Sequence, residues 1–346
     1  MKKSEQTSVA LALGSAVLAA AVIMRARRSS FFFDGKVCLI TGGSRGLGLV
    51  LARQICAEGG KVVLLARDRD ELRRAEAELT AARSDVLTIP CDLLDSAQIR
   101  SAIAAAVDRY HRLDVVINNA GIIEVGPLQH MQQQDFERSM NLHFWAPYYV
   151  IMASLAHLRE APEPRIVNVA SIGGRIAVPH LSPYSASKFA LVGLSDSLRA
   201  ELAQDGIRVT TVLPGMMQTG SHVNAQFKGD HAAEYAWFSA SASLPLVALK
   251  AERAAAKILN ACRRGKPTLM MPFSTRLAIL GNAAFPDLSA QAMKLANRLL
   301  PAATDASGDS LKSGHQSRGG SDRSWITRFG DRAAKRNNES PSPESS

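Results

Sequence analysis

The chain alternates short apolar runs with longer amphipathic stretches between residues 36 and 271. The short runs are rich in Val, Ile and Leu and end in turn residues, a pattern typical of strands buried in a parallel sheet. Helical patterns such as 70–83 and 184–203 lie between them, as in repeated βαβ units with right-handed crossovers. The pattern predicts an α/β fold with one doubly wound, parallel, seven-stranded sheet and helices on both faces. The predicted strands are residues 36–40, 61–66, 85–90, 114–117, 165–170, 207–213 and 268–271.

Changes in composition divide the chain into three parts. After Pro301 the sequence is dominated by Ser, Gly, Asp, Arg and Asn, which predicts a disordered polar tail over residues 302–346. Residues 29–301 are predicted to form the α/β domain, and the long connection 216–248 within it is predicted to be a substrate lid. Only 5% of the residues are aromatic although 47% are hydrophobic, which agrees with an aliphatic core between sheet and helices.

Residues 8–24 form an uncharged apolar run at the short end of the length that spans a bilayer. A cleavable signal peptide and a buried helix of the domain are alternative interpretations. Three arginines follow the run, at positions 25, 27 and 28, as in the basic flank of a single-pass anchor. We therefore expect residues 1–28 to bind membrane lipids and the α/β domain to face the cytoplasm. The two lysines near the N-terminus oppose that orientation.

The net charge of +10 does not favour a nucleic-acid partner, because much of the basic excess lies beside the apolar N-terminal run. The sequence contains no basic stripe interleaved with aromatic residues. The four cysteines are widely spaced, without a CxxC pair or a histidine at metal-ligand spacing. We expect no nucleic-acid partner, no metal site and reduced cysteine thiols in the core.

A glycine-rich turn, TGGSRGLG, joins the first predicted strand to an apolar helical stretch. Glycine allows a tight turn and lets an anion approach backbone N–H groups, while the helix dipole stabilises the negative charge. A strand, such a turn and a helix in this order predict a binding site for the pyrophosphate of a dinucleotide. The spaced glycines of the turn are Gly42, Gly46 and Gly48.

The end of the second predicted strand indicates which dinucleotide is bound. An NAD enzyme usually has an acidic residue there that binds the ribose 2′-hydroxyl, but this chain has Ala66 followed by Arg67. Arg67 and Arg45 are suited to charge-assisted hydrogen bonds with a 2′-phosphate, which favours NADP(H). The alternative is that both arginines are solvated surface charges and that Asp68 binds the ribose.

Tyr184 and Lys188 are four residues apart in a predicted helix, so they project from the same face. An ammonium beside a phenol favours the phenolate and lowers its pKa towards the range of an acid/base catalyst. Ser171 follows the fifth predicted strand and is placed to hold a substrate oxygen. Taken alone, this pair is weak evidence, since a tyrosine and a lysine at this spacing occur by chance on many exposed helices.

The order of the motifs along the chain is more specific than any one of them. The glycine turn comes first, an NNAG motif follows the fourth strand, Ser171, Tyr184 and Lys188 follow the fifth, and a PG pair follows the sixth. The turn itself matches TGxxxGxG. Over roughly residues 33–272 the chain therefore resembles the classical short-chain dehydrogenase/reductase family, which has a Rossmann-type fold.

The resemblance implies a role for each matching residue. Tyr184 is then the catalytic acid/base, Ser171 orients the carbonyl, Lys188 binds the nicotinamide ribose and lowers the pKa of Tyr184, and Asn141 holds a water in the proton relay. The residues that the resemblance assigns to NADP(H) are Gly42, Ser44, Arg45, Gly46, Leu47, Gly48, Arg67, Asp92, Leu93, Asn119, Ala120, Gly121, Tyr184, Lys188, Pro214, Gly215 and Thr219.

The expected activity is the interconversion of a carbonyl and an alcohol by NADP(H)-dependent hydride transfer. The predicted anchor and the apolar side chains of the lid favour a lipophilic substrate, although packing of the lid on its domain explains those side chains equally well. A cofactor-recycling epimerase or dehydratase, and a non-catalytic membrane-tethered nucleotide-binding protein, are alternatives. The resemblance also leaves a homodimer or homotetramer open. The apolar lid residues are Met216, Met217, Phe227, Tyr235, Trp237, Phe238 and Leu244.

Overall fold

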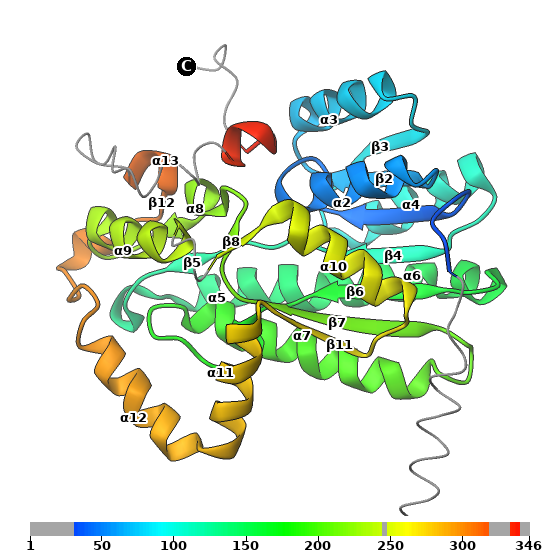
Figure 1. Cartoon of the computed structure of the whole chain (residues 1–346). Helices are drawn as coiled ribbons and strands as arrows, with labels where there is room; N and C mark the ends of the chain where they lie inside the picture. Colours follow the sequence, from blue (N-terminus) through cyan, green and yellow to red (C-terminus); the bar gives the residue numbers. More distant parts are fainter. Residues whose placement is uncertain (1–30, 244–247, 318–332, 340–346) are drawn as a thin grey trace, which may run out of the picture.

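The computed structural model describes residues 31–243, 248–317 and 333–339. Its centre is a seven-stranded sheet in which all the neighbouring strands are parallel (Figure 1). The strand order is β11-β7-β6-β4-β1-β2-β3, so the chain winds outward from β1 in one direction and from β4 in the other. The predicted doubly wound sheet is confirmed. The strands are β1 (Val37–Thr41), β2 (Lys61–Ala66), β3 (Val86–Pro90), β4 (Val115–Asn118), β6 (Arg165–Val169), β7 (Arg208–Pro214) and β11 (Thr268–Met271).

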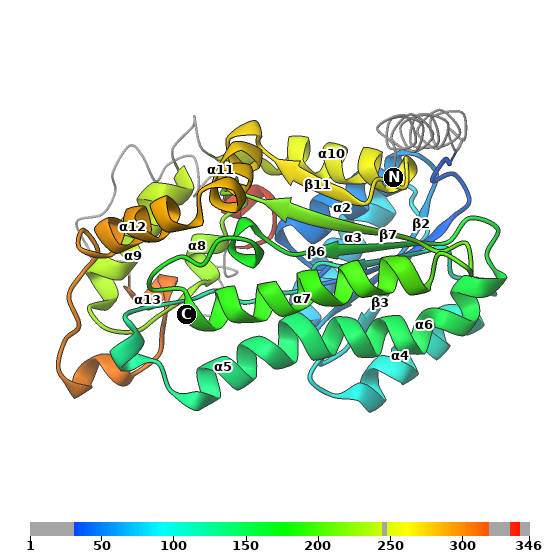
Figure 2. The same ribbon diagram turned by 90° about the horizontal axis from the view of Figure 1, so that it is seen from below.

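Helices cover both faces of this sheet (Figure 2). Side chains of β1 alternate between two cores, because successive residues of a strand point to opposite faces. Cys38 and Ile40 pack in the core that includes α2, α3 and α10, whereas Val37 and Leu39 pack in the core that includes α4, α6 and α7. The helices are α2 (Gly46–Ala57), α3 (Arg69–Ala81), α4 (Ser96–Tyr110), α6 (Ala146–Glu160), α7 (Ser182–Glu201) and α10 (Ala251–Arg263).

A smaller layer covers the carboxyl ends of the strands. It contains the predicted lid, which folds into α8 (Ser221–Asn224) and α9 (His231–Ser243), with β8 (Met217–Gln218) paired to β10 (Leu249–Lys250). On the opposite side, α5 (Gln133–Met140) continues through a π-helical turn (η2, Asn141–Trp145) into α6. Beyond β11 the chain forms the hairpin of α11 (Phe273–Ala284) and α12 (Pro286–Asn297).

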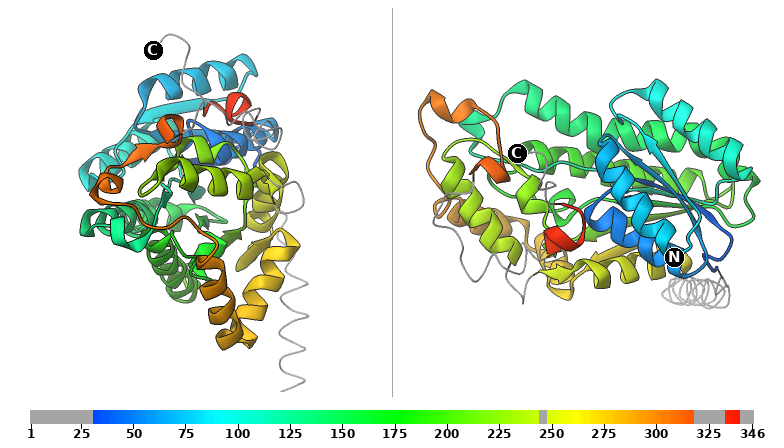
Figure 3. Two further views of the ribbon diagram at one scale, coloured as in Figure 1. Left: turned by 90° about the vertical axis from the view of Figure 1, so that its left-hand side faces the viewer. Right: turned by 90° about the horizontal axis from the view of Figure 1, so that it is seen from above.

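The structure describes two parts of the polar tail, residues 302–317 and 333–339. Residues 302–317 include β12 (Lys312–Ser313), which pairs with β9 (Gln226–Phe227) of the lid. Residues 333–339 also contact the domain, beside α2 and the lid (Figure 3). Backbone and side-chain hydrogen bonds link these segments to the domain, and composition does not reveal them.

The predicted anchor, residues 8–24, lies outside the described residues. In the ranges that the structure describes, no helix is both long enough and apolar enough to cross a membrane.

Candidate active site

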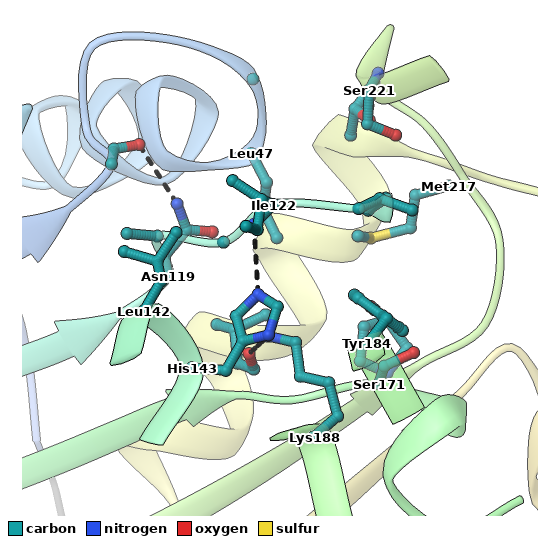
Figure 4. Close-up of a pocket in the computed structure, with 18 of the residues that line it drawn as sticks. Leu47, Asn119, Ile122, Leu142, His143, Ser171, Tyr184, Lys188, Met217 and Ser221 are labelled. Atoms are coloured by element: carbon teal, nitrogen blue, oxygen red, sulfur yellow. Dashed lines mark hydrogen bonds between the residues drawn. The ribbon is translucent and has the colours of Figure 1, made fainter. Parts of the chain in front are cut away.

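One large cavity, of about 1000 Å³, lies where the winding of the sheet reverses, beside the carboxyl ends of β1 and β4. Ligands of doubly wound folds bind at this position, because the connections from the two strands diverge there and leave a crevice. The lid closes the opposite wall of the cavity through side chains of β8 and α9. Figure 4 shows Leu47 at one end of the cavity, with Ser171 and Tyr184 at the other.

The glycine turn forms the end of the cavity near β1 and α2. Gly42 has a φ of +63°, a conformation that disfavours other residues. A Cβ on Gly48 would lie 2.1 Å from the carbonyl oxygen of Gly42, so only glycine allows the turn to close on the helix. The side-chain amide of Asn119 donates to the carbonyl oxygens of Thr41 and Gly42, at 3.2 Å each. This cradle, with the first turn of α2 facing the cavity, fits the pyrophosphate of a dinucleotide.

The end of β2 supplies the next part of the cavity wall. Ala66, Arg67 and Asp68 all line it. The Asp68 carboxylate caps α3 by accepting hydrogen bonds from the backbone N–H groups of Asp70 and Glu71, both at 2.8 Å. The Arg45 guanidinium donates to the Glu71 carboxylate at 2.7 Å. Arg45 and Arg67 therefore line the cavity beside the end of β2, where the Asp68 carboxylate is engaged as a helix cap.

Ser171, Tyr184 and Lys188 meet at the other end of the cavity. Ser171 lies two residues after the end of β6, whereas Tyr184 and Lys188 lie one turn apart on α7. The Lys188 side chain is buried and donates from Nζ to the carbonyl oxygen of Val169 at 3.0 Å. The structure therefore brings together the three residues that the sequence analysis predicted to orient the carbonyl, to transfer the proton and to bind the nicotinamide ribose.

The pKa of Tyr184 shifts in the direction opposite to the sequence-based expectation. Burial raises the pKa of the phenol, and its hydrogen bond with Ser171 opposes that effect. Burial also lowers the pKa of Lys188, to about 7. The Lys188 ammonium lies 5.8 Å from the centre of the Tyr184 ring and is hydrogen-bonded to the backbone, so desolvation outweighs its attraction for the phenolate.

His143 is a buried residue of this site that sequence reasoning missed. Its side chain lines the cavity, fully buried, with its ring edge-on to Tyr184 at 5.5 Å between centres. Nε2 accepts a hydrogen bond from the Ile122 backbone N–H at 3.1 Å, so Nδ1 carries the proton and donates it to the Ser187 hydroxyl at 2.7 Å. Ser187 in turn donates to the Tyr184 carbonyl oxygen at 2.9 Å. This relay ties the loop at Ile122 to the catalytic helix (Figure 4).

The electrostatics of His143 agree with this neutral tautomer. Burial, and then the nearby Lys188, hold the pKa of the imidazole well below its usual range. A second positive charge beside Lys188 is therefore disfavoured, and the ring acts as a neutral link between two backbone segments.

Asn141 does not join this group. It is exposed at the start of the π-helical turn and does not line the cavity. Two residues correspond to about 200° of rotation around a helix, so His143 faces the site while Asn141 faces outward. His143 and Asn141 differ only in which side of the helix they occupy, and the order of residues along the chain does not reveal which side faces the cavity. A π-helical turn at this position is typical of a functional site.

The remaining predicted residues are distributed as follows. Gly48 lies behind the cradle and shapes it without lining the cavity. Of the apolar lid residues, Phe227 and Tyr235 pack inside the lid, and Leu244 lies outside the described residues. The predicted residues that line the cavity are Gly42, Ser44, Arg45, Gly46, Leu47, Arg67, Asp92, Leu93, Asn119, Ala120, Gly121, Ser171, Tyr184, Lys188, Pro214, Gly215, Met216, Met217, Thr219, Trp237 and Phe238.

A half-buried phenol next to a buried lysine, a hydroxyl beside them and a dinucleotide cradle in one cavity define a nicotinamide-dependent oxidoreductase site. Comparison with known proteins agrees. The family model described as short chain dehydrogenase matches residues 36–228. The chain therefore belongs to the short-chain dehydrogenase family, whose Rossmann-type fold binds a nicotinamide cofactor.

Particular relatives extend this comparison. The chain is 36% identical over 220 residues to "Dehydrogenase/reductase SDR family protein 7-like" of Anopheles gambiae, covering 62% of this chain and 69% of that protein. It is 37% identical over 185 residues to "Granaticin polyketide synthase putative ketoacyl reductase 1" of Streptomyces violaceoruber, covering 53% and 68%. Among solved structures, a short chain dehydrogenase/reductase from Burkholderia phymatum in complex with NAD superposes with a TM-score of 0.69. That match covers 75% of this chain and 96% of the other at 23% identity, so it supports the fold alone.

Proposed function

We propose that this protein interconverts a carbonyl and an alcohol on a lipophilic substrate, using NADP(H) and Tyr184 as acid/base. The observation that carries the proposal is the convergence of Ser171, Tyr184 and Lys188 on the cavity that also contains the glycine cradle. The nicotinamide, when bound, supplies or accepts the hydride.

The protein's own residues handle the proton. Tyr184 donates its hydroxyl proton to the carbonyl oxygen during reduction and removes a proton from the alcohol during oxidation. Because burial raises the pKa of Tyr184, the phenol keeps its proton at neutral pH, which suits the reductive direction. The Ser171 hydroxyl holds the same substrate oxygen in place. Lys188, with a pKa of about 7, is able to return a proton towards Tyr184 near neutral pH.

NADP(H) is proposed because positive charge lines the end of the cavity beside β2. Arg45 and Arg67 line the wall there, and β2 ends in Ala66, without a carboxylate to repel a 2′-phosphate. Glu71 pairs with Arg45 in this structure, at a place where a 2′-phosphate would offer the same guanidinium a more highly charged partner. Replacing Glu71 with Gln should therefore strengthen NADPH binding, while the affinity for NADH changes little.

A lipophilic substrate is proposed because apolar side chains of the lid face the catalytic end of the cavity. Met216, Met217, Trp237 and Phe238 line it, together with Leu181 from the start of α7. The test is a panel of ketones and aldehydes of increasing chain length, followed by oxidation of NADPH with purified protein. Turnover that rises with apolar length supports the proposal. A protein that binds NADPH but consumes none, and instead converts one isomer into another, would be the epimerase alternative.

We further propose that residues 8–24 anchor the protein in a membrane, with the catalytic domain on the cytoplasmic side. The apolar run and the arginines at positions 25, 27 and 28 support this. Large apolar side chains exposed on the hairpin of α11 and α12, and just after it, add a second surface suited to lipid. They are Phe273, Leu277, Leu280, Phe285, Leu288, Leu295 and Leu299.

The full chain is expected to stay in the membrane fraction after a carbonate wash, because an apolar helix is not released by pH or salt. A chain that begins at residue 29 should be recovered as soluble protein and should still bind NADPH. Full-length protein found in the soluble fraction would refute the anchor, and a mature protein that begins near residue 22 would establish a signal peptide instead.

A further inference from the structure

The C-terminal segment Ala333–Glu339 lies against the glycine cradle (Figures 1 and 3). The backbone N–H of Gly46, at the start of α2, donates to the carbonyl oxygen of Asn337 at 2.8 Å. The Asn338 side chain donates to the carbonyl oxygens of Ser44 and Glu71, at 2.9 and 3.1 Å. The segment is therefore bonded to the turn that would hold a pyrophosphate.

Arginines of the domain hold the same two asparagines. Arg53 on α2 donates to the Asn337 side-chain oxygen at 2.9 Å, and Arg74 on α3 donates to that of Asn338 at 2.7 Å. Asn224 of the lid donates to the Glu339 carbonyl oxygen at 3.3 Å. Side chains of α2, α3 and the lid thus all bind this one short segment. Together they form a specific binding site for it.

The Glu339 side chain enters the cavity itself. A Cβ on Gly46 would lie 2.6 Å from its Oε1, and one on Gly220 would lie 2.3 Å from its Oε2, so the carboxyl fills the gap between cradle and lid. The residue is only 7% exposed, and Oε2 has no hydrogen-bond partner among the described residues. Burial raises the pKa of this carboxyl well above its usual range, with Arg45 opposing the shift and Glu71 adding to it.

In this fold the pyrophosphate of a dinucleotide binds at this helix N-terminus, between the glycines of the cradle. The Gly46 N–H that bonds to Asn337 and the space that Glu339 fills are part of that cradle. Two ligands cannot share them. We propose that the segment Ala333–Glu339 is an internal ligand of the cradle, which competes with the pyrophosphate of the nicotinamide dinucleotide and must leave before the cofactor binds.

This proposal rests on the proposed nicotinamide-dependent function. It predicts an equilibrium between a tail-bound form, in which the segment occupies the cradle, and an open form that binds the cofactor. If the tail-bound form outweighs the open form by about ten to one, the apparent Kd for the cofactor is raised about tenfold. The buried Glu339 oxygen that lacks a partner limits how tightly the segment binds, because an unsatisfied buried polar atom is costly. We therefore expect the pyrophosphate of the cofactor to displace the segment from the cradle.

The test compares cofactor affinity, measured by NADPH fluorescence without turnover, in the full chain and in three variants. Glu339→Lys places a like charge towards Arg45 and should lower the Kd about tenfold, as should removal of residues 333–346. Lys335→Ala changes an exposed residue of the same segment and should leave the Kd unchanged. A synthetic peptide of residues 333–339, added to the shortened chain, should raise the Kd again.

Equal Kd values for the full chain, Glu339→Lys and the shortened chain would overturn the proposal while leaving the dinucleotide site intact. If the shortened chain fails to fold, the Glu339→Lys comparison decides alone. Failure of every form to bind either NADPH or NADH would instead refute the proposed function.

Discussion

The two ends of the cavity are built differently. At the catalytic end, Lys188 and His143 are buried and hydrogen-bonded to backbone atoms or to a neighbouring hydroxyl, so their positions depend on the packed core. At the dinucleotide end, the Gly46 backbone N–H donates to the backbone carbonyl oxygen of Asn337, and the partly exposed Arg45 pairs with the Glu71 carboxylate. The side chains of the catalytic end are therefore held in place before any ligand binds. At the dinucleotide end, a ligand must replace the groups that are bonded there now.

This difference follows from what each end must do. A proton donor has to be aligned with the reacting oxygen. Side chains that a packed core already holds in place lose little conformational entropy when the reaction occurs. A phosphate site needs unoccupied N–H groups, which are costly to leave unpaired in a folded protein. Substitutions at the catalytic end should therefore change turnover or stability, and substitutions at the dinucleotide end should change cofactor affinity.

The largest effect is expected from Tyr184→Phe. The substitution keeps the ring but removes the proton that is transferred, so turnover should fall by roughly 10²–10⁴. NADPH affinity should change little, because the cradle is at the other end of the cavity. Steady-state kinetics and a fluorescence titration measure the two quantities. Tyr149→Phe on α6, outside the cavity, is the matched control, and a Tyr184→Phe enzyme within about threefold of the parent would remove the acid/base assignment.

A smaller effect, confined to binding, is expected from Arg67→Ala. Loss of a charge-assisted bond to the 2′-phosphate should weaken NADPH by roughly 1.5–3 kcal/mol and leave NADH nearly unchanged. Arg69→Ala, two residues along and outside the cavity lining, is the control. Isothermal titration with both cofactors measures the difference, and equal losses for NADPH and NADH would show that Arg67 does not contact the 2′-phosphate.

His143→Phe tests whether the catalytic end is held by its core. The substitution keeps a ring but leaves the Ile122 N–H without its acceptor and Ser187 without its donor, which should lower the free energy of unfolding by about 1–3 kcal/mol. Urea unfolding at pH 8, where the native imidazole is neutral, measures this loss. His143→Asn, which can still accept one of the two bonds, should lose less. A variant as stable as the parent would show that the relay does not hold the site.

The same residue predicts how stability depends on pH. Because the pKa of His143 is lowered in the folded state, the unfolded chain binds the extra proton more readily, and stability rises with pH. The parent should therefore lose stability as the pH falls below about 6.5, the usual pKa of histidine. His143→Phe should lack this contribution, and identical slopes for the two proteins would contradict the assignment.

The sequence predicted the fold closely, because short continuous apolar runs and glycine turns are local signals. Predicted strands 61–66 and 268–271 match β2 and β11 at both ends, and the other five begin and end within one residue of those observed. Ser171, Tyr184 and Lys188 were predicted to form one site because the order of the motifs along the chain resembles that of the short-chain dehydrogenase/reductase family. Composition does not reveal the hydrogen bonds that link the described parts of the tail to the domain.

The sequence by itself determined the sheet, the cradle glycines and the Tyr184–Lys188 pair that we propose for proton transfer, since each depends on residue type and on spacing within one or two elements. Only the tertiary structure decided that His143, and not Asn141, faces Tyr184, because the choice depends on how a helix is rotated against its neighbours. Likewise, only the tertiary structure raised the pKa of Tyr184 and brought Glu339 to Gly46. Desolvation and contacts between distant segments arise from the assembled core, and no local pattern encodes them.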